Sequence, residues 1–441
     1  MTEKNHFDGA NYVTNFNAAS TELPGSSVAW LNDLRQSSMT AFENVGLPGP
    51  KVEEWKYSNL NILKSGQYQF LNESSSQDLQ IDNLCDKEFL KDIKGAKVVF
   101  CNGYYHQSLS NISAEPGITL VNLNEYIKVG PKDAQRLIHQ KKSKSSLNAL
   151  NAALMSDGVV LIVEQDVKLS EPIQIIHINT EMATAKALRN RHYIQIEKNA
   201  SAQIIESYIG VDGVDCWSHT VSEINVADGA SLEIYQFQNE GNATIHTNEA
   251  IIDLGEGTTF KHCSLNIGGR LSRTEIKPTL KGINSKIELR GAFLSRDGNS
   301  HDVFTHIKHM VEQCDSEQNY RGVLAKGGKS AFQGKVYVAK DAQLTNANQS
   351  NKNLILERGA EANSKPELLI YADDVKCSHG ATVGELDQEA LFYLKTRGLD
   401  QAAAKALLVE AFIAEVYEDV VLEPVKCKYL DLARKWLEAE L

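Results

Sequence analysis

Hydrophobic and polar positions alternate in short runs through most of the chain, from about residue 96 to residue 385. Strict alternation predicts strands with one buried side. Four segments repeat one plan, in which a run, a tight polar or glycine-containing turn and a second run follow one another: HYIQIEKNASAQIIES (192–207), SEINVADGASLEIYQF (222–237), AIIDLGEGTTFKHCSL (250–265) and IKPTLKGINSKIELRG (276–291). This region is therefore predicted to be mainly β.

The repeated turns are evenly spaced, with centres about 27–30 residues apart at Ala200, Gly229, Gly257 and Asn284. Short strands at a regular spacing, with no helices between them, favour a β-solenoid whose coils stack on one another. In that fold the four turns align in successive coils. The side chains expected to stack inside are Ile204, Leu232, Phe260 and Ile287. An ordinary β-sandwich also has short, regularly spaced strands and remains the alternative.

The pattern before this region is mixed and partly helical. In residues 1–95, one helix face is predicted from the spacing of Trp30, Leu31, Leu34 and Met39. A loop over residues 48–60 leads into a short helix, and NESSSQD (72–78) is typical of a polar linker. One further helix, starting at Pro131, is expected to interrupt the β region over about 131–155.

The pattern after the β region is helical. Asp387 and Asp400 can each cap the start of a helix, and Gly398 stands where the first helix should stop. Longer helices are expected over 401–421 and 426–439. The chain thus divides into a mixed or helical region 1–95, a β core 96–385 and a helical region 386–441. Both flanking regions are candidates to cap the ends of a solenoid, whose last strands have unpaired backbone groups.

Composition and charge narrow the function classes. The chain has 441 residues, 42% of them hydrophobic and 23% charged, which is ordinary for a globular protein. The net charge of -12 argues against binding to nucleic acid or to an anionic membrane, because both need basic patches. No apolar run reaches the roughly 18 residues of a spanning helix. The start, MTEKNHFDGANYVTNF, has no pattern of a secretory signal, so a cytoplasmic protein is expected.

The seven cysteines are scattered, and none forms a C-x-x-C pair: Cys85, Cys101, Cys216, Cys263, Cys314, Cys377 and Cys427. An odd number without paired spacing favours reduced thiols over a disulfide framework. A closed zinc ribbon is likewise not encoded.

Two segments resemble functional motifs without fulfilling them. GVLAKGGKS (322–330) lacks the first glycine of a phosphate loop, since Val323 occupies that position, and a strand-like run follows it. It is predicted to be a solenoid turn. His301, His306 and His309 have no spacing that gives a compact ligand pair, because His306 falls on the opposite side of a strand.

The segment YADDVKCSHGATVGELD (371–387) is the strongest site candidate. If residues 371–383 form a strand, Cys377 and His379 share its apolar, odd-numbered face, which is expected to be buried. A thiolate and an imidazole two residues apart could bind one iron or zinc ion. Two ligands do not close a metal site, so the others would come from another coil, a partner chain or water. The alternative is a core cysteine beside a hydrogen-bonded histidine.

Residues 353–400, which contain this segment, resemble the C-terminal signature of the SufB/SufD family of iron–sulfur cluster assembly proteins. Further matches upstream are HIKHMVEQCDSEQNYRGVLAKGGKSAFQGKVYVAKDAQLTNANQ (306–349) and, more weakly, EEWKYSNL (53–60). The resemblance implies a right-handed parallel β-helix core flanked by helical domains. The N-terminal region lacks the cysteine cluster that many SufB chains carry.

The resemblance also implies a function without enzymatic activity of its own. It implies pairing with a SufB-like scaffold and a SufC-like ABC ATPase, and a role in iron supply and cluster formation. His379, with Cys377 beside it, would act at the scaffold interface on a transient iron ion or cluster, with no stably bound cofactor. The isolated chain could form a homodimer. The rival function is a secreted-type carbohydrate-active β-helix enzyme, which needs clustered catalytic residues and usually a secretory signal; neither is evident.

The helix predicted over 401–421 is apolar on more than one side. Its charged residues spread around the axis: Lys405, Glu410, Glu415, Glu418 and Asp419. We expect one side to rest on the end of the solenoid and the other on a partner, because large exposed apolar patches are uncommon. The resemblance names that partner as the SufC-like ATPase. The alternative is that the helix over 426–439 covers the second side unaided.

Overall fold

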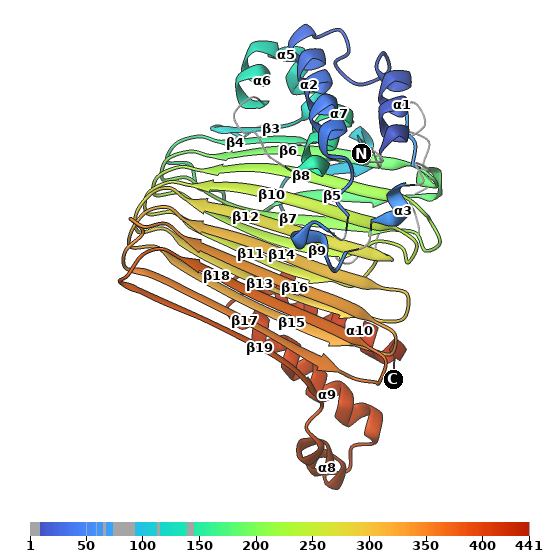
Figure 1. Cartoon of the computed structure of the whole chain (residues 1–441), viewed down its shortest axis with the longest axis vertical. Coiled ribbons are helices and arrows are strands. Elements are labelled where there is room, and N and C mark those ends of the chain that lie inside the picture. Colours follow the sequence, from blue (N-terminus) through green and yellow to red (C-terminus); the bar gives the residue numbers. More distant parts are fainter. Residues whose placement is uncertain are drawn as a thin grey trace, which may run out of the picture.

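The structure is a computed structural model that describes residues 9–49, 51–58, 60–64, 68–73, 93–112, 115–138 and 145–440. Within these residues the strands form two long sheets that face each other and are joined by short turns (Figure 1). The ten-stranded sheet has the order β19-β17-β15-β13-β11-β9-β7-β5-β1-β2, and the nine-stranded sheet has the order β18-β16-β14-β12-β10-β8-β6-β4-β3. The predicted β-solenoid is confirmed.

Eight coils stack in the described part of the chain, each made of two consecutive strands, one from each sheet. Neighbouring coils pair in parallel. The strands are β4 (Val159–Val163), β5 (Ile173–Asn179), β6 (Ala187–Ile196), β7 (Ser201–Gly210), β8 (Trp217–Val226), β9 (Ser231–Asn239), β10 (Ile245–Leu254), β11 (Thr259–Asn266), β12 (Leu271–Leu280), β13 (Lys286–Ser295), β14 (Ser300–His309), β15 (Asp315–Leu324), β16 (Lys329–Val338), β17 (Thr345–Ile355), β18 (Glu361–Ile370) and β19 (Val375–Glu385).

The predicted turns align, with one correction. The backbone is left-handed at the same turn position in successive coils: φ is 58° at Asn199, 69° at Gly229, 63° at Gly257 and 59° at Asn284. Glycine and asparagine adopt this conformation most readily, which explains the recurring residue types. The first centre was predicted at Ala200, one residue too late. The left-handed residue is Asn199, because asparagine adopts this conformation more readily than alanine.

The predicted core residues are all buried in one cluster. One of them is not in register with the others, as follows from the strand pairing. Leu232, Phe260 and Ile287 pair directly across strands. Ile204 pairs with Ile234, and the residue in register with Leu232 is Ala202. Sequence spacing alone cannot distinguish positions two residues apart on one strand face, since both point inward.

The first end of the solenoid is closed by antiparallel strands. β2 (Tyr104–Tyr105) pairs antiparallel with β1 (Lys97–Cys101), and β3 (Ile118–Asn122) pairs antiparallel with β4. A reversal of direction stops the parallel stacking of coils there. The other end consists of β18 and β19, the last strands of the two sheets.

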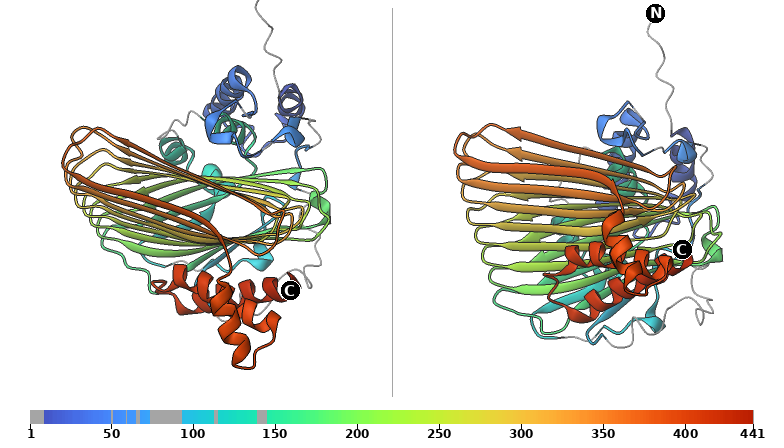
Figure 2. Two further views of the ribbon diagram at one scale, coloured as in Figure 1. Left: turned by 60° about the horizontal axis from the view of Figure 1, so that its bottom comes forward. Right: turned by 90° about the horizontal axis from the view of Figure 1, so that it is seen from below.

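N-terminal helices cover the outer face of the nine-stranded sheet near its first strands (Figures 1 and 2). They are α1 (Ala10–Ala19), α2 (Ala29–Val45), α3 (Asn61–Lys64), α5 (Leu123–Val129), α6 (Pro131–Ile138) and α7 (Ser146–Leu154). Leu31 and Met39 form the buried face predicted for α2. Short 3-10 turns span Glu53–Trp55, Gln107–Leu109, Glu181–Ala183 and Glu415–Tyr417. Most of the predicted linker 72–78 lies outside the described residues.

The helix predicted over 131–155 is two helices. α6 starts at Pro131 as predicted, but it ends at Ile138. α7 has a start of its own, where the Ser145 side chain accepts a hydrogen bond from the Asn148 N–H. A serine cap of this kind satisfies a backbone N–H that is unpaired only at the start of a helix. The cap therefore marks the start of a separate helix.

The C-terminal helices cover the outer face of the ten-stranded sheet, on the opposite side from the N-terminal helices (Figure 2). They are α8 (Gln388–Thr396), α9 (Gln401–Ala414) and α10 (Glu423–Glu440). Asp387 and Asp400 cap α8 and α9 as predicted. The helix predicted over 401–421 ends at Ala414, and the last helix starts at Glu423. No helix of the described residues is long and apolar enough to cross a membrane.

The prediction that these helices rest on the end of the solenoid is wrong. Two buried hydroxyls fix them to the side of the sheet: Tyr417 donates to the carbonyl of Ser264 at 2.8 Å, and Tyr429 donates to the carbonyl of Gln236 at 2.8 Å. Outward apolar side chains such as Phe237 and Leu265 give the helices an apolar surface to cover. The last coil is therefore left without a covering element among the described residues.

Candidate functional site

The uncovered last coil is the candidate site. Among the described residues, β18 pairs only with β16, and β19 pairs only with β17. The outer edge of each strand therefore lacks a neighbouring strand. Apolar side chains are exposed there, among them Ile370, Tyr371 and Val383. Unpaired backbone groups beside exposed apolar side chains are typical of an edge that pairs with another chain.

β19 brings Cys377 and His379 to the same side, facing the interior of the last coil. The strand starts at Val375, not at Tyr371 as predicted, because residues 371–374 form the turn after β18. Cys377 is in register with Ala347 and packs partly against the apolar cluster of the last coils. Burial raises the pKa of the Cys377 thiol, and a backbone hydrogen bond with Ala347 opposes the rise.

His379 is exposed, so the expectation that this strand face is buried is wrong at that position. An inward side chain in an earlier coil is covered by the next coil. In the part of the chain that the structure describes, no coil follows β19, and the inward positions of the last coil therefore open onto solvent. The pair stays together at the open end, which leaves room for further ligands to come from outside this chain.

A polar column leads to His379 through the ten-stranded sheet. Gln318 is in register with Gln349, and Gln349 is in register with His379. Gln349 is only 4% exposed, and neither of its amide atoms has a hydrogen-bond partner among the described residues. Gln349 was not among the predicted site residues. The available signal was the segment TNANQSNKN (345–353), which is polar at every position except Ala347 and follows a series of alternating strands.

A second cluster of ligand-type side chains lies inside the first coils and was also missed. His177, His192 and Glu206 place their ligand atoms within 4.8 Å of one another, and all three are buried. Nε2 of His192 lies 3.2 Å from Nε2 of His177 and 3.7 Å from Oε1 of Glu206. The three residues come from three strands, so only the register of the coils brings them together.

Hydrogen bonds explain this cluster without a metal. The N–H of Val159 donates to Nδ1 of His192 at 2.9 Å, so neutral His192 carries its proton on Nε2 and donates it to His177. Burial lowers the pKa of His192 to about 3 and raises the pKa of Glu206, which accepts from Tyr208 at 2.7 Å. A metal would need Nε2 of His192 without its proton, whereas metal-bound histidines normally donate from the other nitrogen. The cluster is a hydrogen-bonded part of the core.

The other predicted positions have structural roles. GVLAKGGKS crosses the turn between β15 and β16, as predicted. His301 and His309 are buried inside the coil, and Nε2 of His309 lies 2.9 Å from the hydroxyl of Ser316. His306 is on the outer side of the same strand, so the three histidines do not converge.

Comparison with known proteins identifies the family. The model of the SUF system FeS cluster assembly SufBD core domain matches residues 177–412, and the model of the SufBD protein N-terminal region matches residues 8–175. The iron–sulfur cluster assembly protein SufD of Escherichia coli is 30% identical over 90% of both chains.

The chain belongs to the SufBD family.

Two further relatives of this SufBD chain have similar coverage. SufD of Bacillus subtilis is 27% identical over 90% of this chain and 92% of its own length. A SufBD family protein of Synechocystis sp. is 28% identical over 91% of this chain and 90% of its own length. The family is one of iron–sulfur cluster assembly in the SUF system, which favours that role over the alternative of a carbohydrate-active enzyme.

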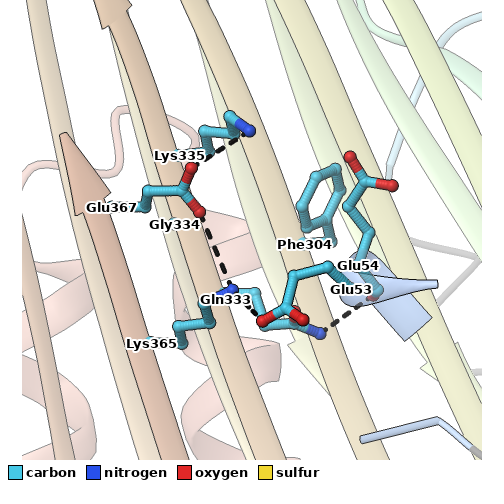
Figure 3. A pocket seen from close by; sticks show the side chains of 8 residues that line it. All are labelled: Glu53, Glu54, Phe304, Gln333, Gly334, Lys335, Lys365 and Glu367. Carbon is cyan, nitrogen blue, oxygen red and sulfur yellow. Dashed lines mark hydrogen bonds and ion pairs between the residues drawn. The ribbon is translucent and has the colours of Figure 1, made fainter. Parts of the chain in front are cut away.

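The EEWKYSNL segment of this SufBD chain reaches the later coils from the N-terminal region. Figure 3 shows it at a hollow of about 80 Å³ on the outer face of the nine-stranded sheet. Nζ of Lys365 lies 2.5 Å from Oε1 of Glu53, and Nε2 of Gln333 donates to the carbonyl of Glu54 at 3.1 Å. Lys335 pairs with Glu367 at 3.1 Å. Ion pairs within the chain line the hollow, and the pair between Glu53 and Lys365 ties the segment to β18.

The same segment is anchored more deeply by a buried charge network. The guanidinium of Arg273 lies 3.9 Å from the ring centroid of Trp55 and forms an ion pair with Asp302. Ser58 donates a hydrogen bond to Asp302. Arg273 and Asp302 are almost fully buried, and Arg273 also pairs with the buried Glu275 at 2.7 Å, so these groups compensate one another's charge.

Proposed function

We propose that this SufBD chain is the SufD-type subunit of an iron–sulfur cluster assembly complex. It pairs through the open end of its solenoid with a SufB-like scaffold. His379 and Cys377 offer ligands to an iron ion or cluster, which is cargo and not a resident cofactor. Such a complex would work in the cytoplasm, where thiols stay reduced.

The single observation that supports this proposal is the uncovered last coil with Cys377 and His379 on its inner side. Both sheets end in strands whose edges can pair with strands of a partner. A partner that continues the solenoid would cover His379 and shield the pair from water. Its own side chains would complete the ligand set. In the absence of the scaffold, a second copy of this chain can use the same edges.

The chemistry of the pair fits a transient site. Burial keeps the Cys377 thiol protonated, so binding of a metal must displace that proton. A thiolate and a neutral imidazole are ligands that iron accepts. Since two ligands bind more weakly than a complete set, the chain by itself should release iron readily and retain it only against the scaffold.

The test is cluster assembly in the complex of all three subunits. The chain is co-expressed with its SufB-like and SufC-like partners and purified without oxygen, and iron and sulfide are measured. His379→Ala and Cys377→Ser should reduce both to background while the complex still forms. The matched control is Ser378→Ala, whose hydroxyl points away and bonds to Asn348 at 2.7 Å. Normal assembly by both site variants would make the pair structural.

The C-terminal helices are the proposed contact for the ATPase. α9 buries Val409 and Ile413 in the cluster it shares with the sheet, whereas Leu407 stays exposed. Phe392 and Tyr393 on α8 and Val421 are exposed as well. α10 covers part of the second side of α9 but not Leu407, so an apolar surface remains. Exposed apolar patches of this kind mark protein contacts.

Point substitutions test this contact better than removal of the helices. Truncation after Gly398 would uncover the buried face around Phe237 and Leu265 and endanger the solenoid. Leu407→Asp and Phe392→Asp should each weaken capture of the ATPase at least tenfold in a pull-down titration, with unchanged thermal stability. Lys395→Asp changes the charge of α8 without removing apolar surface and serves as the control. Unchanged capture by both apolar variants would exclude this surface.

A further inference from the structure

The buried side-chain amide of Gln349 lacks a hydrogen-bond partner among the residues that the structure describes. The residue lies in β17, in the coil before the one that carries His379. Parallel neighbours in register are about 4.8 Å apart. Both amide atoms of its buried side chain lack partners among the described residues. Buried amides are normally hydrogen-bonded, so an unpaired one next to a candidate ligand suggests a partner that is not yet in place.

The surroundings hold the side chain in this position. Gly334 lies opposite Gln349, and a Cβ built on Gly334 would lie 2.3 Å from Nε2 of Gln349. The glutamine thus spans the interior of the seventh coil and uses the space that the glycine leaves. It lies at the base of the open end, in the coil directly before the one that carries Cys377 and His379.

Gln318, one coil deeper, differs in its hydrogen bonding. Its Oε1 accepts a hydrogen bond from the hydroxyl of Thr305 at 2.5 Å. The acceptor of Gln349 is open, although the two glutamines occupy the same position in successive coils. In this column the Oε1 of Gln318 therefore has a hydrogen-bond donor, whereas the Oε1 of Gln349, next to His379, has none among the described residues.

We propose that Gln349 is a positioning residue for His379. When a partner covers the open end, Oε1 of Gln349 accepts the ring N–H of His379, and the other ring nitrogen faces the iron. A neutral imidazole has one N–H to donate and one nitrogen to coordinate, and metal-bound histidines normally donate the N–H to a nearby oxygen. This inference rests on the proposed function, because it assigns His379 a metal to bind.

The test measures the tautomer of His379 and the affinity for a probe metal in the complex. The chain is labelled with ¹⁵N-histidine and combined with the unlabelled scaffold, and His379→Ala assigns the signal. In the wild type one ring nitrogen should carry the proton. Gln349→Met, which keeps the volume without the acceptor, should mix the tautomers and weaken Co²⁺ binding about 10–100-fold. Gln349→Glu, which keeps an acceptor, should restore the single tautomer and the affinity.

The matched control is Gln318→Met, which removes the same group one coil deeper and should change neither readout. The inference is overturned if Gln349→Met leaves the tautomer and the Co²⁺ affinity as in the wild type. In that case, if His379→Ala loses Co²⁺ binding, the proposed function of His379 holds without a role for Gln349. If His379→Ala itself binds Co²⁺ normally, the proposed function fails and the inference fails with it.

Discussion

Gly334 and Gln349 face each other across the interior of the seventh coil, and the glutamine side chain occupies the space where a Cβ on the glycine would stand. The contact joins the two sheets in the coil that directly precedes the last one. A side chain at Gly334 would have to displace Gln349 and Phe332, and the conformational freedom of glycine is not used there, since Gly334 is not among the residues with positive φ. The requirement is one of space alone.

Gly334→Ala should therefore destabilise the protein. The added methyl would also meet Phe332 at 2.9 Å, so the cost should be about 1–3 kcal/mol, as for other overpacked cores. Denaturant unfolding measures it. Gly380→Ala is the control, because a Cβ there would meet no atom within 4 Å. Equal stability of the two variants would contradict the close approach.

Asp302→Ala should have a larger effect. Removal of this carboxylate leaves the guanidinium of Arg273 with one fewer partner in a buried site and frees Ser58, which should cost about 3–5 kcal/mol. Glu53→Ala removes an ion pair at the surface of the same segment and should change stability by less than about 1 kcal/mol. If both substitutions cost the same, the buried network does not anchor the segment.

Tyr429→Phe should loosen the C-terminal helices. The substitution removes a buried hydrogen bond to the carbonyl of Gln236, which is worth about 1 kcal/mol. Tyr393→Phe, at an exposed site on α8, should have no measurable effect on stability. Hydrogen exchange would localise the change: faster exchange in α10 of the Tyr429 variant is expected, and uniform exchange across the chain would refute the local contact.

Stability should fall in acid because buried histidines are held neutral. Burial lowers the pKa of His219 from 6.5 to about 4. The unfolded chain then binds a proton that the folded chain does not, so stability is complete above pH 6.5 and is lost as the pH falls towards about 4. One such group contributes about 1.4 kcal/mol per pH unit in that window.

His219→Gln should remove this share of the pH dependence. The difference between the free energies of unfolding at pH 7.5 and pH 5 should shrink by about 2 kcal/mol, whatever the variant does at neutral pH. His379→Gln is the comparison at an exposed position. The assignment to His219 is refuted if the two variants show the same pH dependence as the wild type.

Much of the fold could be predicted because it is encoded over short distances. Alternation within ten residues gives a strand, and a glycine or asparagine at a left-handed turn gives its end, as at Gly257 and Asn284. Asp387 and Asp400 were recognisable as caps for the same reason. The exact register was not encoded locally, and Ile204 was therefore placed one pair away from its true partner.

The site was only half predictable. The alternation of a strand puts Cys377 and His379 on one side, whatever the rest of the fold does. Whether that side is buried depends on the presence of a following coil, about one repeat further along, and the described residues contain none after Glu385. The role of Gln349 depends on Gly334 in the opposite sheet, which no local pattern relates to it.

By itself, the sequence determined the strands, the turns, the helix caps and the shared face of Cys377 and His379, because each is fixed by neighbours within a few residues. The tertiary structure alone decided which end of the solenoid is open, where the C-terminal helices lie, and that Ser58 meets Asp302 across 244 residues. It also brought His177, His192 and Glu206 together. These relationships arise from the stacking of coils, which joins residues that share a position in the repeat and not a place in the chain.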